Sequence, residues 1–180
     1  MAKQNNKKIC GTGAGPYTST VMEHFKKPHN YGKIKDADGI GKVGNLVCGD
    51  VMWLYIKIAK NKAGQEIVKD IKFETFGCVA AIATSSAITD LAKGKTLEAA
   101  VAINKQEIVK ELGGLPPIKL HCSVLAADAL VEAVYDYYTK QNRVISPDLE
   151  QKHQRIQKEK DIVEEKYKDW TSKEEEIHNK

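Results

Sequence analysis

The sequence predicts an α+β fold, namely a small antiparallel three-stranded sheet with helices packed on one face, plus a charged C-terminal helix. Residues 51–58 alternate between two sets, Val51, Trp53 and Tyr55 against Met52, Leu54 and Ile56, which is typical of a strand. Over about 67–76, apolar residues such as Ile71 and Phe73 alternate with charged ones such as Lys72 and Glu74, which predicts a second strand. At Gly77-Cys78 the apolar period changes from two to about 3.6, and helical patterns follow. Because the strands come before most of the helices, an α+β arrangement is favoured over repeated βα units.

The elements of the sheet half are read in chain order. A short helix is expected at residues 19–27, capped by Thr18 or Ser19 and ended by Pro28 and Gly32. A short strand at 39–45 comes next, and Gly49 allows a sharp bend into the strand at 51–58. Asn61-Lys-Ala-Gly64 supplies the turn into the strand at 67–76. We expect this antiparallel sheet to bury one face.

The helical half starts at Cys78 with an apolar stripe that Gly94 ends. Thr96 begins another helical stretch, and Asn104-Lys-Gln-Glu107 has the pattern of a capping box. Paired glycines and then Pro116-Pro117 interrupt the chain. A long amphipathic helix is predicted from near His121 to about Gln141.

Composition sets broad limits on the function. The 180 residues, 42% hydrophobic and 29% charged, suit one domain with appendages: a flexible segment at 1–16, a folded domain at 17–145 and a charged helical tail at 146–180. No apolar run reaches the roughly 20 residues of a membrane span, and the N-terminus does not have the pattern of a secretory signal. We expect a cytoplasmic protein that binds neither membrane nor nucleic acid.

The tail differs from the body in charge and pattern. Its net charge is −2 from Asp148 onward, against +6 for the residues before it, so the body could favour an acidic protein partner. One apolar residue recurs every seven positions: Leu149, Ile156, Val163, Trp170 and Ile177. A coiled-coil seam needs two per heptad. The tail therefore reads as a charged helix with a thin apolar edge and a break near Thr171-Ser-Lys-Glu174. Both a solvated tail and a docking helix remain open.

The four cysteines are Cys10, Cys48, Cys78 and Cys122, and their spacing fits neither a disulfide framework nor a zinc ribbon. Cys10 lies in the polar N-terminal segment and is interpreted as incidental. Cys78 and Cys122 fall at predicted helix starts, where the helix dipole favours thiolate over thiol, and Cys48 falls at a glycine bend. Asp50 and His121 stand close in sequence and offer further donors. Three buried, inert cysteines are the alternative, and spacing alone does not decide between the two readings.

Two further histidines, His24 and His29, could bind a metal ion. Each is isolated from other ligands in the sequence. We interpret both as solvated or packed side chains.

The local sequences around the cysteines favour the functional reading. Val43-Gly-Asn-Leu-Val-Cys-Gly-Asp50, Thr75-Phe-Gly-Cys78 with Ala81-Ile-Ala-Thr-Ser-Ser86, and Leu115-Pro-Pro-Ile-Lys-Leu-His-Cys122 closely resemble three signature segments of one family. That family is the IscU / NifU N-terminal family of iron–sulfur cluster assembly scaffolds. Glu23-His-Phe-Lys-Lys-Pro-His-Asn-Tyr-Gly32 also looks like it. The resemblance covers about residues 17–141.

The resemblance implies a scaffold, not an enzyme, that builds a [2Fe–2S] cluster from iron and sulfide and passes it to apo-proteins. Cys48, Cys78 and Cys122 would be thiolate ligands, with Asp50 and His121 as exchangeable ones. Cys122 would also accept persulfide sulfur from a cysteine desulfurase. An Hsp70-type chaperone with its co-chaperone would grip an extended segment formed by Leu115, Pro116, Pro117, Ile118 and Lys119. A homodimer is left open.

A related reading is a zinc-binding sulfur-transfer protein that accepts persulfide, and Zn²⁺ would also suit the apo site. That class carries an insertion between its last two cysteines and lacks a histidine beside the third. Here the gap from Cys78 to Cys122 is 44 residues, without such an insertion, and His121 is present, so the scaffold reading is favoured. A non-catalytic adaptor with a structural metal is a third reading. The scaffold reading requires the sulfurs at 48, 78 and 122 to meet at one accessible rim of the fold, with Asp50 and His121 within bonding reach.

Overall fold

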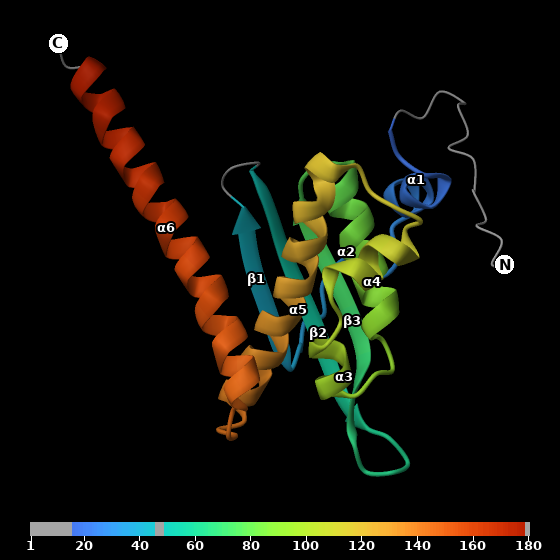
Figure 1. Cartoon of the computed structure of the whole chain (residues 1–180). Coiled ribbons are helices and arrows are strands. Elements are labelled where there is room, and N and C mark those ends of the chain that lie inside the picture. The colour runs from blue at the N-terminus through green and yellow to red at the C-terminus, as the bar shows by residue number, and fades with distance from the viewer. Residues whose placement is uncertain (1–15, 46–48, 179–180) are drawn as a thin grey trace, which may run out of the picture.

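The structure, a computed structural model, describes residues 16–45 and 49–178. It contains a three-stranded antiparallel sheet in the order β1-β2-β3, formed by Gly39–Asn45, Asp50–Lys60 and Glu66–Phe76 (Figure 1). The register pairs Lys42 with Trp53 and Leu54 with Phe73. The predicted α+β fold, with its sheet and packed helices, is confirmed.

One face of the sheet forms the core, as the alternation predicts. Met52, Leu54 and Ile56 of β2 are buried, as are Ile71 and Phe73 of β3. Helices α2 (Val79–Ala92) and α5 (Leu120–Lys140) cover this face (Figure 1). Removing these apolar side chains from water supplies most of the stability of the sheet.

Two glycines in β1 set how closely α5 approaches the sheet. A Cβ at Gly39 would lie 2.1 Å from the carbonyl oxygen of Ala133, and one at Gly41 would lie 1.9 Å from that of Ala129. No real side chain tolerates such distances. Glycine is therefore required at both positions for α5 to lie directly on β1.

The smaller helices follow the sequence prediction closely. They are α1 (Ser19–Lys26), α3 (Leu97–Val101) and α4 (Lys105–Glu111). Thr18 caps α1 by accepting a hydrogen bond from the Val21 N–H, and the capping box of Asn104 with Glu107 is present at α4. Gly49 has φ +70°, which explains why glycine makes the bend before Asp50.

The expected extended segment before α5 is wrong in part. Pro116 is extended, with φ −56° and ψ 140°, but Pro117–Lys119 forms a 3₁₀ helix that the Lys119 N–H closes on the Pro116 carbonyl at 2.8 Å. Proline suits the first position of such a helix because the N–H it lacks would have no helical partner. Ile118 remains exposed, with 79% of its surface in solvent.

The C-terminal helix α6 (Pro147–His178) is continuous in its backbone, so the break expected near Thr171 is wrong. Its first turns are docked on α5. Leu149 and Ile156 are buried, and Arg155 donates to Asp128 at 2.5 Å. Burial raises the pKa of Asp128 to about 6 even though Arg155 opposes the shift. None of the described helices is both long enough and apolar enough to cross a membrane.

Candidate functional site

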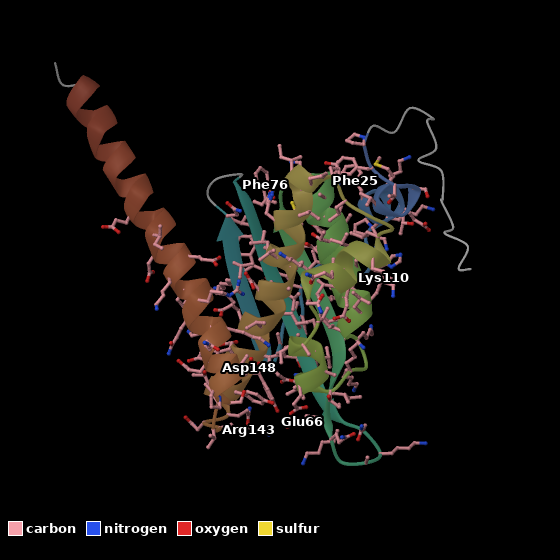
Figure 2. All side chains as sticks on the ribbon, in the orientation of Figure 1. Phe25, Glu66, Phe76, Lys110, Arg143 and Asp148 are labelled. Atoms are coloured by element: carbon pink, nitrogen blue, oxygen red, sulfur yellow. The ribbon has the colours of Figure 1, made fainter. Side chains whose placement is uncertain are left out.

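Three elements bring potential ligands to one end of the sheet. Asp50 begins β2, Cys78 is the N-cap of α2 directly after β3, and Cys122 lies in the first turn of α5. This end is the upper one in Figure 1 and is marked in Figure 2 by Phe76, whereas Glu66 and Arg143 mark the opposite end. We call Asp50, Cys78, His121 and Cys122 the thiol site.

The donor atoms of the thiol site lie close to one another. Cys122 Sγ is 3.8 Å from Cys78 Sγ, 3.7 Å from Asp50 Oδ2 and 3.5 Å from His121 Nε2. Asp50, Cys78 and Cys122 form one group whose ligand atoms all lie within 4.8 Å of one another. Cys78 and Cys122 are the two cysteines within the described ranges, and no disulfide joins them.

These spacings fit a single ion held by mixed ligands. On a tetrahedral ion, bonds of about 2.3 Å to sulfur and about 2.0–2.2 Å to oxygen or nitrogen separate neighbouring donors by about 3.5–3.8 Å. The three distances that meet at Cys122 Sγ all fall in that range. Asp50, Cys78 and Cys122 could therefore hold zinc or an iron of an iron–sulfur cluster. His121 reaches Cys122 Sγ but does not belong to that group of three, so its ring would have to move to bind the same ion.

Asp50 is held in place by the start of α2. The residue is 3% exposed, and its Oδ1 accepts a hydrogen bond from the Cys78 N–H at 3.3 Å. A Cβ at Gly77 would lie 2.6 Å from the same oxygen, so glycine leaves room for the carboxylate. One oxygen of Asp50 thus anchors the helix start, while the other faces the Cys122 thiol.

Tyr17 and Lys119 also border the thiols. Burial raises the pKa of the Tyr17 phenol, and the Cys78 thiolate raises it further. The same thiolate raises the pKa of the Lys119 ammonium, which offsets negative charge at the site. Sequence reasoning missed Tyr17, because a lone tyrosine outside the cysteine segments carries no signal. It assigned Lys119 only to partner binding.

The thiols are less open than the sequence suggests. Cys122 is 1% exposed and packs with Ala80 and Ala81, against which Tyr17 and Leu115 also lie. Cys78 is partly exposed. The expected accessible rim is therefore wrong for Cys122, because a side chain in the first turn of α5 points into the contact with α2. Cys48 lies outside the described residues, so its predicted position near the other thiols stays a prediction.

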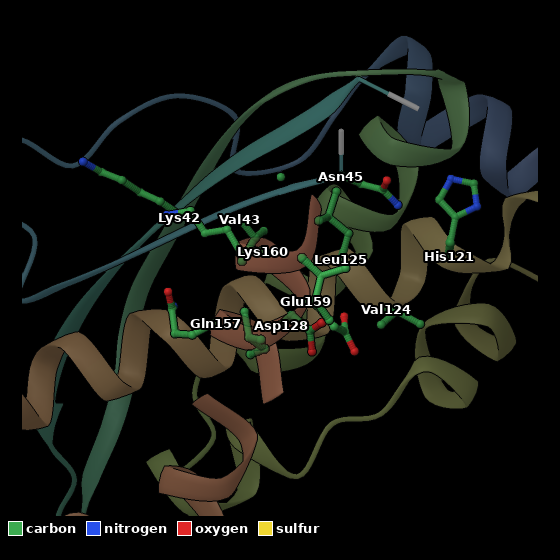
Figure 3. Close-up of a pocket in the computed structure, with 13 residues that line it drawn as sticks. Lys42, Val43, Asn45, His121, Val124, Leu125, Asp128, Gln157, Glu159 and Lys160 are labelled. Atoms are coloured by element: carbon green, nitrogen blue, oxygen red, sulfur yellow. The ribbon is translucent and has the colours of Figure 1, made fainter. Parts of the chain in front are cut away.

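A cavity of about 390 Å³ adjoins the thiol site on its β1 side. Its walls come from β1, α5 and α6, and Figure 3 shows His121 at one end and Gln157 toward the other. Apolar lining from Val43, Leu125 and Ile156 alternates with charged side chains. The tail, whose role the sequence leaves open, thus forms one wall of a space that reaches His121.

The structure also joins His24, His29 and Asp90, whose potential ligand atoms lie within 4.8 Å of one another. The interpretation of these histidines as isolated is wrong. They lie about 60 residues before Asp90 in the chain, so no local pattern could reveal the meeting. Only the packing of α1 on α2 brings the three together.

The fold and the thiol site together define a family. Residues 16–144 match the family model described as the NifU-like N terminal domain. The chain belongs to that family, and the resemblance inferred from its cysteine segments is confirmed.

Individual relatives agree. The iron–sulfur cluster assembly scaffold protein IscU 1 of Archaeoglobus fulgidus is 54% identical over 128 residues, which is 71% of this chain and 80% of that protein. The protein IscU of Haemophilus influenzae is 48% identical over 128 residues, covering 69% of this chain and 98% of its own. The solved N-terminal NifU-like protein from Brucella abortus has a TM-score of 0.53 at 20% identity, covers 68% of this chain and 94% of its own, and shares the fold.

Proposed function

We propose that this chain is a scaffold on which an iron–sulfur cluster is assembled and from which it is transferred to apo-proteins. The observation that carries the proposal is the convergence of Cys78, Cys122 and Asp50 at distances of 3.8 and 3.7 Å, measured from Cys122 Sγ. Membership of the NifU-like family supports it. We assign the cluster as [2Fe–2S], with Cys48 as a third thiolate and with Asp50 and His121 as the exchangeable donors.

A mixed donor set suits a temporary holder. Thiolates bind iron strongly, whereas a carboxylate or imidazole exchanges more readily and changes its ligation with pH. Asp50 Oδ2 already faces the thiol pair. We expect this carboxylate to loosen one iron during transfer. To check this, cluster transfer from Asp50→Ala to an apo-ferredoxin is timed against wild type. A rate equal to wild type or faster rejects the role.

The sulfur would arrive as a persulfide on Cys122. The Cys122 thiolate attacks the terminal sulfur of the desulfurase persulfide, the sulfane sulfur passes to Cys122, and the desulfurase thiolate leaves. Because Cys122 is buried beneath Tyr17 and Leu115, this step needs the 115–119 segment to move. Mass spectrometry after incubation with desulfurase and cysteine should find one added sulfur atom, about 32 Da, on Cys122. An adduct confined to Cys48 or the more exposed Cys78 contradicts the assignment.

Exposed apolar side chains beside the thiols offer a surface for the proposed partners. Phe76 is 76% exposed, and Ile118 and Leu120 also face solvent. We assign Leu115, Pro116, Pro117, Ile118 and Lys119 to an Hsp70-type chaperone and its co-chaperone. Because Pro117–Lys119 is a 3₁₀ helix, a chaperone that binds extended peptides would have to unwind it.

The deciding experiment is anaerobic reconstitution of the full chain with iron and sulfide. Wild type should turn brown with charge-transfer absorption, and Cys78→Ser and Cys122→Ser should lose most of it. Cys10→Ser is the matched control and should load like wild type. A colourless protein that holds one zinc per chain instead supports the zinc-binding sulfur-transfer function, which the same tetrahedral spacings also suit.

A further inference from the structure

His24, His29 and Asp90 form a second group of potential metal ligands, distinct from the thiol site. His24 lies in the last turn of α1, His29 in the turn that follows it, and Asp90 in the last turn of α2. The path along α2 from Cys78 to Asp90 is about 18 Å at a rise of about 1.5 Å per residue. The two groups are therefore too far apart to share an ion.

The hydroxyl of Ser86 fixes both histidines. Ser86 Oγ accepts a hydrogen bond from the His29 backbone N–H at 2.8 Å and lies 2.8 Å from His24 Nδ1. In the tautomer that carries its hydrogen on Nδ1, His24 donates to Ser86 and keeps the lone pair of Nε2 for an ion. Metal-bound histidines characteristically make such a bond with their second ring nitrogen.

The turn that carries His29 is also held from the other side. Asn30 has φ +55°, and its Nδ2 donates to Thr89 Oγ1 at 2.9 Å and to Asp90 Oδ1 at 3.0 Å. Its carbonyl accepts from the Phe73 N–H at 3.0 Å, which ties the turn to β3. The three candidate ligands thus stand on backbone that is already fixed.

Ring geometry suits two imidazoles on one ion. The centroids of His24 and His29 are 4.8 Å apart, with their planes tilted by 50°. Bonds of about 2.0–2.1 Å place each centroid about 3.2 Å from the ion, so ligands at 90–110° have centroids about 4.5–5.2 Å apart. His29 Nδ1 and Asp90 Oδ2 are 2.6 Å apart and must open by several tenths of an ångström, which two half-exposed side chains allow.

Exposure gives the ion a way in. His24 is buried, whereas the side chains of His29 and Asp90 are 50% and 37% exposed. Three protein ligands with one open side leave room for water, as in zinc and iron(II) sites built from two histidines and a carboxylate. We propose that His24, His29 and Asp90 bind a divalent transition-metal ion of the Zn²⁺ or Fe²⁺ type at the contact between α1 and α2.

A simple ion pair between His29 and Asp90 is the competing explanation, and the chain offers a matched control for it. His153 and Glu132 form a similar pair, with His153 Nδ1 2.8 Å from Glu132 Oε1. They belong to neither group of three potential ligands found among the described residues. If pairing alone were enough, His153 would bind metal as well as His29.

The experiment titrates the full, reduced chain with Co²⁺ under anaerobic conditions. Cobalt bound to thiolates gives an intense near-ultraviolet charge-transfer band together with visible bands, whereas cobalt bound only to nitrogen and oxygen gives weaker visible bands without that charge transfer. The second class is therefore read as the visible absorption gained after the near-ultraviolet band has reached its maximum. Wild type should show both classes. His29→Gln and Asp90→Asn should keep the thiolate class unchanged and lower the cobalt affinity of the nitrogen–oxygen class at least tenfold. A tenfold loss is at the lower end of what is seen when even an outer-shell partner of a metal ligand is removed. His153→Gln should leave both classes unchanged.

A second measurement guards against misfolded variants. Zn²⁺ is added to wild type beyond the amount that saturates the thiol site, and the ring nitrogens of His24 and His29 are followed by NMR. Selective shifts of both rings support the site. Absence of the nitrogen–oxygen class in wild type, its survival in both variants, or unmoved ring signals overturns the proposal. None of its ligands belongs to the thiol site, so failed cluster assembly leaves this result unaffected.

Discussion

The two ends of α2 carry groups of opposite chemical character. At the N-terminal end Cys78 meets Cys122 and Asp50, whereas in the last turn Asp90 meets two histidines. The positive end of a helix dipole stabilises anions such as thiolates, and the negative end stabilises cations. The dipole of α2 thus favours thiolates at its N-terminal end, whereas at its C-terminal end it would favour a bound cation and disfavour the Asp90 carboxylate.

The two ends also differ in how the ligands are supported. At the thiol site the Asp50 carboxylate bonds the helix start, so a ligand is itself part of the framework. At the histidine end Ser86 supports the His24 ring and the His29 backbone without being one of the candidate ligands. Substitutions at the thiol site should therefore disturb folding and ligand binding together. Substitutions at the histidine end can affect one without the other.

Gly77→Ala is the substitution expected to disturb the thiol site most. Its Cβ would lie 2.6 Å from Asp50 Oδ1 and 2.8 Å from Ala81 Cβ, so the carboxylate or the helix must shift. We expect a loss of about 1–3 kcal/mol in unfolding free energy and poorer cluster loading. Urea unfolding and reconstitution measure the two effects. Gly44→Ala is the control, because its nearest contact would be 3.4 Å from Val51 Cγ1. Equal behaviour of the two variants would contradict the tight fit.

Two adjacent serines test the support at the other end. Ser86→Ala leaves the buried His24 Nδ1 and the His29 N–H without their partner, so we expect a loss of about 1–2 kcal/mol in unfolding free energy. Ser85 donates to the Ala81 carbonyl at 2.7 Å, which lies within the same helix. Ser85→Ala should therefore cost less than about 1 kcal/mol. Thermal unfolding compares them, and a larger loss for Ser85→Ala contradicts the assigned role of Ser86.

Two substitutions separate the structural role of Asp50 from its role as a metal ligand. Asp50→Asn keeps an oxygen that can accept from the Cys78 N–H, whereas Asp50→Ala removes it. We expect the alanine variant to be about 1 kcal/mol less stable than the asparagine variant in denaturant unfolding. Both variants should bind metal at the thiol site more weakly than wild type. Equal stability of the two would show that the hydrogen bond to α2 contributes little.

Much of the fold was predictable because its signals are local. Strand alternation gives Met52, Leu54 and Ile56 the same face, and the capping box marks the start of α4. The thiol site was also accessible from sequence, since Cys78 and Cys122 each follow a local break in the chain. Its burial was not, because the packing of Tyr17 against α2 joins segments far apart in sequence.

The histidine group shows why the remainder could not be predicted. His24 and Asp90 stand on different helices, and Ser86 is only one of several small polar residues in α2. No sequence pattern within α2 distinguishes Ser86 from the other small polar residues of that helix. The docking of the first turns of α6 could not be predicted from the sequence either, because the ion pair of Arg155 with Asp128 forms only where that helix packs on α5.

The smallest expected effect is the dependence of stability on pH at the histidine end, measured in the metal-free chain. Burial, and then His29, lower the pKa of His24, while Asp90, Glu23 and Glu111 oppose the shift. The unfolded chain takes up this proton near pH 6.5 and the folded chain only at lower pH, so acid favours unfolding. The contribution of neutral His24 is therefore complete above about pH 7 and is lost as the pH falls through its lowered folded pKa. His24→Gln should lose less stability than wild type between about pH 7.5 and 5.5 in urea unfolding. A parallel decline of the two proteins would show that His24 is not the group that titrates.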